Sequence, residues 1–117
     1  MSDVFSGKWK NQLGSLLDLQ VADGEVSGRL DMGVGNDGEP LWVEVRGRAG
    51  TDLITFNAVF PNHGTVVAWV GQHTVEGQVR QIRTVWVHAT NVPDSQEQAW
   101  MWSSNRIGAD VFKRVSD

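Results

Sequence analysis

The polar residues Asn11 and Ser15 lie four positions apart near the start of the chain, in a segment that is otherwise strand-like and apolar. The same inward phase returns in three later strand-like segments with Trp69, Trp86 and Asp110. Tryptophan rings at such positions form apolar walls, and an inward carboxylate is costly unless it is bonded. Such polar groups and rings around one interior predict a pocket that holds a small ligand.

A purely structural interpretation of the same residues is also open. Tryptophans at inward positions, Trp9 among them, bury apolar area in any β-barrel. Asp110 needs a bonding partner, and Asn11 is the natural one, so an Asp–Asn bond would satisfy the carboxylate without a ligand. Both interpretations predict that Asp110 and Asn11 are in contact.

The elements that must position these residues are strands, because apolar and polar residues alternate in runs that turn residues interrupt at regular intervals. Asp23-Gly24 and Glu76-Gly77 are predicted two-residue hairpin turns, where glycine supplies a positive φ. Longer connections over residues 33–40 and 91–98 are predicted at the mouths of the barrel, and residues 99–104 could add a helical turn. The pattern predicts an all-β fold, an eight-stranded antiparallel up-and-down β-barrel, with strands at residues 7–13, 15–22, 25–32, 41–48, 53–60, 65–74, 78–89 and 107–115.

Composition sets the limits of this prediction. The 117 residues, 40% of them apolar, predict one domain over residues 1–117 with a single core. The net charge of −4, without a lysine or arginine run, argues against nucleic acid or a membrane as partner. There is no cysteine for a disulfide or a thiolate metal site. The chain as given has neither a long apolar stretch nor the layout of a signal peptide, and is expected to be soluble.

Two further patterns suggest chemistry but lack its context. Residues 33–38 match the G-x-G-x-x-G dinucleotide fingerprint, yet a proline and a strand-like run follow where a helix is needed. His63 and His73 have no second metal ligand at a recognisable spacing, and there is no Ser-His-Asp or paired-carboxylate arrangement. We therefore expect no metal, no cofactor and no enzymatic activity. His88 shares the face of Trp86, so it is predicted at the rim of the interior. There it would bond to water, contact a ligand or act as a proton switch.

The segment from Gly7 to Ser15 resembles the opening strand of the avidin/streptavidin family of biotin-binding barrels, including its bacterial members. Four later stretches resemble the same family in order, and the similarity covers nearly the whole chain; these are residues 22–36, 69–72, 84–86 and 107–112. The resemblance implies a non-enzymatic protein that binds biotin in the lumen of the barrel.

The resemblance also implies a role for individual residues. Asn11 and Ser15 would bond the ureido oxygen of biotin, and Asp110 would bond a ureido N–H and polarise the oxygen through Asn11. The side chain of Thr65 and the backbone amide of Asn36 would meet the valerate carboxylate. Aromatic walls would come from Phe60, Trp69, Trp86 and, from a neighbouring subunit, Trp102.

Three positions depart from the family pattern by carrying apolar side chains. Leu30 stands in place of a tyrosine, Met32 in place of a serine and Val67 in place of a threonine. Each lost hydrogen bond to a buried ligand group costs about 1–3 kcal/mol, so biotin is expected to bind with weakened affinity. The alternative is the same barrel repurposed for a different, more apolar small molecule.

Several strands are apolar on both faces, which predicts association of barrels. Val66, Ala68 and Val70 alternate with inward residues, as do Val85 and Val87 on the next strand. Outward apolar surface usually marks an interface, and symmetric homo-oligomers are the usual way to bury it. The family resemblance implies a homotetramer, with a dimer as the alternative. It also suggests a secreted protein, although the residues themselves leave the compartment open.

Overall fold

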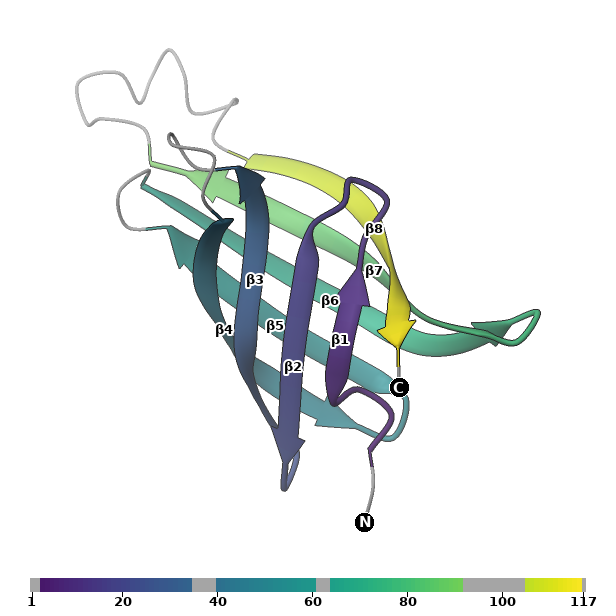
Figure 1. The fold of residues 1–117 in the computed structure, drawn as a ribbon. Coiled ribbons are helices and arrows are strands. Elements are labelled where there is room, and N and C mark those ends of the chain that lie inside the picture. Colours follow the sequence, from purple (N-terminus) through teal and green to yellow (C-terminus); the bar gives the residue numbers. More distant parts are fainter. Residues whose placement is uncertain (1–2, 35–39, 61–63, 92–104, 117) are drawn as a thin grey trace.

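The computed structural model describes residues 3–34, 40–60, 64–91 and 105–116, and these residues form a closed barrel. Each strand pairs with its sequence neighbours in antiparallel fashion, and pairing of β1 with β8 closes the barrel (Figure 1). The predicted eight-stranded antiparallel β-barrel is therefore confirmed. The strands are β1 Gly7–Lys10, β2 Leu16–Ala22, β3 Glu25–Val34, β4 Pro40–Gly50, β5 Leu53–Phe60, β6 Thr65–Glu76, β7 Val79–Thr90 and β8 Asn105–Ser116.

The hairpin turns follow from residues with positive φ. Asp23 and Gly24 have φ of 53° and 80°, as the predicted two-residue turn requires. The β6–β7 turn is displaced by one residue from the prediction, because Gly77 and Gln78 have φ of 54° and 73° while Glu76 still pairs with Val79. The two turn residues are therefore Gly77 and Gln78, whereas Glu76 and Gly77 were predicted.

The remaining strand boundaries differ from the prediction mainly at strand ends. β1 stops at Lys10, three residues early, because Asn11 starts a tight turn. β3 extends to Val34, β4 begins at Pro40, and β8 begins at Asn105. The predicted helical turn over residues 99–104 lies outside the described residues.

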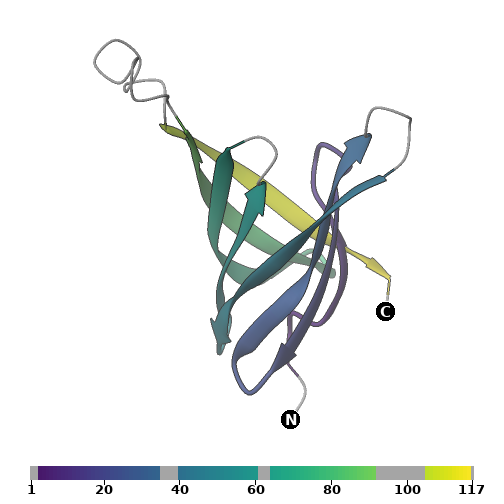
Figure 2. The ribbon, with the colours of Figure 1, turned by 90° about the vertical axis from the view of Figure 1, so that its left-hand side faces the viewer.

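β1 begins and β8 finishes at the same end of the barrel, opposite the β1–β2 turn (Figure 1 and Figure 2). Buried side chains fill the interior at this end. Trp9 and Phe5 are fully buried there, and the indole Nε1 of Trp9 donates to the carbonyl oxygen of Phe5 over 2.8 Å. The guanidinium groups of Arg80 and Arg114 lie over the Trp9 ring, 5.7 and 5.2 Å from its centroid. Large side chains therefore close this end of the lumen.

His73 is part of this closed end. Its ring packs edge-on against Phe5 and Trp9, and its side chain is only 9% exposed. Arg80 Nε donates to His73 Nε2 over 3.3 Å, which requires an unprotonated nitrogen there. Burial and the positive charge of Arg80 lower the pKa of His73 below its ordinary value of 6.5. This histidine is thus held neutral by the fold.

We predict that His73 makes the protein less stable in acid. The unfolded chain takes up a proton at this histidine as pH falls through 6.5, whereas the folded chain takes it up only at lower pH, so the free energy of unfolding falls below pH 6.5. Urea denaturation at several pH values should show a shallower acid loss in His73→Gln than in the parent. An identical pH dependence in both proteins would contradict this role.

Candidate ligand-binding site

A pocket of about 280 Å³ occupies the other part of the lumen, near the β1–β2 turn. Its volume lies close to the lower end of the range of small-molecule sites, roughly 300–1,000 Å³. Three of its lining residues were not predicted, namely Leu13, Arg106 and Phe112. The predicted residues that line it come from four strands and the β1–β2 turn, and are Asn11, Ser15, Leu30, Val67, Trp69, Trp86, His88 and Asp110.

Asp110 is the central polar group of this pocket, and both of its carboxylate oxygens are bonded. Gln12 Nε2 donates to Oδ1 over 2.8 Å, and the indole Nε1 of Trp69 donates to Oδ2 over 3.2 Å. Thr84 fixes the backbone behind it, since its hydroxyl donates to the Asp110 carbonyl oxygen over 2.9 Å. Only 7% of Asp110 is exposed, so these bonds offset the cost of burying a charge. A carboxylate still has lone pairs for further donors.

The partner of Asp110 was predicted wrongly. Asn11 does not bond to it, because the Asn11 Oδ1 atom accepts the backbone N–H groups of Leu13 and Ser15, over 3.0 and 2.8 Å, and so holds the β1–β2 turn. Gln12 bonds to Asp110 instead, and its Oε1 also accepts the backbone N–H of Val111 over 3.0 Å. Because the Asn11 side chain holds the turn, the neighbouring Gln12 is the residue that bonds to Asp110.

Asn11 and Ser15 nevertheless both line the pocket. Within the described part of the chain, no hydrogen bond involves the Asn11 Nδ2 group or the Ser15 hydroxyl. These two donors line the same pocket as the Asp110 carboxylate. The pocket thus combines donors and an acceptor, which suits a planar ligand group that itself carries both.

Aromatic side chains form much of the remaining wall. Trp69 stacks on Phe56 with 5.0 Å between ring centroids, and Phe56 packs edge-on against Phe112 at 6.3 Å. Trp86 lies against Gly108 of the adjacent strand, where a Cβ atom would be 2.2 Å from the Trp86 ring. The absence of a side chain at Gly108 therefore leaves room for the Trp86 ring.

Of the predicted site residues, two do not line the pocket and three lie outside the described residues or side chains. Phe60 and Thr65 are described but do not line it, and Phe60 belongs to the buried core instead. These two residues are opposite each other at the ends of β5 and β6. Asn36, Trp102 and the side chain of Met32 lie outside the described residues. The predicted roles of these three therefore stay predictions.

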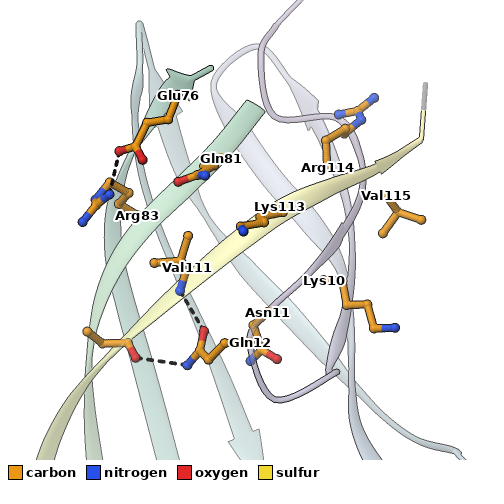
Figure 3. Close-up of a pocket in the computed structure, with 11 residues that line it drawn as sticks. Lys10, Asn11, Gln12, Glu76, Gln81, Arg83, Val111, Lys113, Arg114 and Val115 are labelled. Atoms are coloured by element: carbon orange, nitrogen blue, oxygen red, sulfur yellow. Dashed lines mark hydrogen bonds and ion pairs between the residues drawn. The ribbon is translucent and has the colours of Figure 1, made fainter. Parts of the chain in front are cut away.

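A second hollow, of about 770 Å³, lies on the outer side of β1, β7 and β8 (Figure 3). It is lined mainly by exposed, long side chains, among them Lys10, Lys113 and Arg83, and Arg83 forms an ion pair with Glu76 at 2.6 Å. Ligand sites are mostly apolar with a few placed polar groups, which describes the lumen pocket better than this charged groove. We therefore take the lumen pocket as the candidate site.

Within the residues that the structure describes, no group of three or more His, Cys, Asp or Glu side chains is close enough to hold a metal ion. Nor does that part of the chain contain a helix with the length and apolar character needed to cross a membrane.

We predict that Gln12 holds the site together in the absence of ligand. Gln12→Ala removes side-chain bonds that join the β1–β2 turn to Asp110 and Val111, so the free energy of unfolding should fall by about 1–3 kcal/mol. Gln20→Ala, at an exposed position of β2, is the matched control and should change stability little. Urea denaturation of both variants gives the comparison, and equal stability of the two would contradict the role of Gln12.

Comparison with known proteins places this geometry in a family. The Avidin family model matches residues 2–115. Among solved structures, the chain is similar to a biotin binding protein from chicken, with 24% identity, a TM-score of 0.78 and 95% of each chain covered. It is also similar to the rhizavidin–biotin complex, with 27% identity, a TM-score of 0.74, and 94% of this chain and 99% of the other covered. No curated protein sequence shows a significant match. The match of the family model over nearly the whole chain shows that this protein belongs to the avidin family.

Proposed function

We propose that this protein is a non-enzymatic binder of biotin and that it uses the lumen pocket. The observation that carries the proposal is the buried Asp110 carboxylate, placed in one pocket with the Asn11 amide and the Ser15 hydroxyl. A ureido group has one acceptor oxygen and two N–H donors. Asn11 and Ser15 can donate to the oxygen, while Asp110 can accept from an N–H. Membership of the avidin family and similarity to a structure described as a biotin complex support this choice.

The apolar remainder of biotin would lie against Trp69, Trp86 and Val67, which line the same pocket. Leu30 is 1% exposed and also faces this space, but its side chain offers no hydrogen bond to the ureido oxygen. We therefore expect weaker binding than in a site where a hydroxyl group occupies this position, by about 1–3 kcal/mol for one missing bond. The same apolar surface favours the second candidate function, binding of a more apolar small molecule.

Isothermal titration calorimetry with biotin tests the proposal, and tryptophan fluorescence provides a second signal because Trp69 and Trp86 line the pocket. We expect one biotin per chain in the parent and an affinity at least about tenfold lower in Asp110→Asn, which keeps the shape but removes the carboxylate. Asp18→Asn, on the outer side of β2, is the matched control. Equal affinity in Asp110→Asn and the parent would contradict the proposed site.

The two candidate functions give different results in the same titration. Saturable binding of a medium-chain alkanol, with no heat from biotin, would favour the apolar ligand. Binding of biotin that Asp110→Asn weakens would favour the ureido ligand. The comparison therefore separates the proposed function from its alternative.

We further propose that the protein forms a homo-oligomer through the outer faces of β6, β7 and β8. Val70, Val85 and Ile107 are 63%, 53% and 73% exposed on these strands. Register joins the outward residues into one surface, because Val70 is opposite Val85 and Val87 is opposite Ile107. An apolar surface that spans three adjacent strands suits burial against a second barrel. A homotetramer is the assembly that we propose, with a dimer as the alternative.

Sedimentation velocity at micromolar concentration tests this assembly. The parent should sediment as four copies, or as two in the alternative, and Val85→Lys should shift it toward the monomer because a charge would be buried at the centre of the surface. Leu53→Lys, at another exposed apolar position outside these three strands, serves as the control. A parent that sediments as a monomer would contradict the proposed interface.

A further inference from the structure

The rim of the lumen pocket carries two nitrogen-rich side chains on adjacent strands. His88 of β7 and Arg106 of β8 are opposite each other in register, and both line the pocket. The same pocket holds the Asp110 carboxylate, four residues further along β8. The polar groups of the pocket therefore fall into two sets, one around Asp110 and one at His88 and Arg106.

His88 has an unused hydrogen-bonding atom. Its Nε2 lies 3.4 Å from the Thr90 hydroxyl, whereas its Nδ1 is buried and has no hydrogen-bond partner among the described residues. A buried polar atom without a partner is unfavourable, and native proteins contain few of them. Because this nitrogen is buried, the imidazole must turn toward the lumen before Nδ1 can donate to an oxygen atom of a ligand.

Arg106 supplies a positive charge beside it. Within the described residues, Arg106 makes no ion pair or hydrogen bond, and the nearby Asp110 is already bonded by Gln12 and Trp69. The chain as a whole has a net charge of −4, so it does not attract anions in general. A local guanidinium group at the pocket rim would act on an anion that is already placed there, because its planar donors match a carboxylate.

From these observations we infer that Arg106 and His88 form the subsite that holds the carboxylate of the ligand at the rim of the pocket. The neutral polar end lies at Asp110, and the apolar middle lies between the walls of Trp69 and Trp86. This inference rests on the proposed function and adds to it a charge requirement. It assigns the carboxylate to β7 and β8, whereas the family resemblance implied Thr65 and the backbone of Asn36.

The test compares biotin with biotinamide, in which a neutral amide replaces the carboxylate. By calorimetry, the parent should bind the acid about tenfold or more tightly than the amide. The preference should shrink toward equality in Arg106→Leu and should decrease in His88→Leu. Lys113→Leu removes an exposed cation of the same strand that does not line the pocket, so the preference should persist in this control.

Each outcome bears on the inference. Equal affinity of the parent for acid and amide, or an undiminished preference in Arg106→Leu, would overturn it and leave the proposed function intact. Failure of both compounds to bind would instead overturn the proposed function, and octanoate against octanamide would then test the rim without a ureido group. A preference for octanoate that disappears in Arg106→Leu would support the inference, and no preference would overturn it.

Discussion

A buried carboxylate must keep its hydrogen bonds, and the part of the lumen that holds the pocket is organised around that requirement. Asp110 of β8 is bonded by Trp69 from β6 and by Gln12 from the β1–β2 turn. Loss of either partner would leave part of a buried charge uncompensated, which is among the more costly changes in a protein interior. The same bonds fix one wall ring and one turn, so they define the polar end of the pocket before any ligand arrives.

The barrel divides its interior between stability and binding. At one end Trp9 and Phe5 fill the lumen and pack against His73, whose pKa is lowered by burial. At the other end the side chains leave a space of about 280 Å³. An eight-stranded barrel has an interior that side chains can just fill, or that can hold one small ligand. This chain does both in different parts of one lumen.

Alternating residues and glycine turns were enough to predict the strands, their order and the inward phase of Trp69, Trp86 and Asp110, because a period of two fixes which face a side chain occupies. The same argument missed Gln12, which lies in a turn where alternation no longer applies. The asparagine at position 11 could have indicated this turn, since an asparagine side chain can accept backbone N–H groups of the residues that follow it. Arg106 was missed because the last strand was predicted to begin at residue 107, one residue beyond it.

The central claim is that the lumen pocket receives the ureido group of biotin at Asp110. A crystal structure of the protein grown with biotin tests it most directly. We expect density for one biotin per barrel, with a ureido N–H within hydrogen-bond distance of Asp110 and the ureido oxygen near Asn11 and Ser15. Biotin found only outside the lumen, or inside it with the ureido ring away from Asp110, would contradict the account.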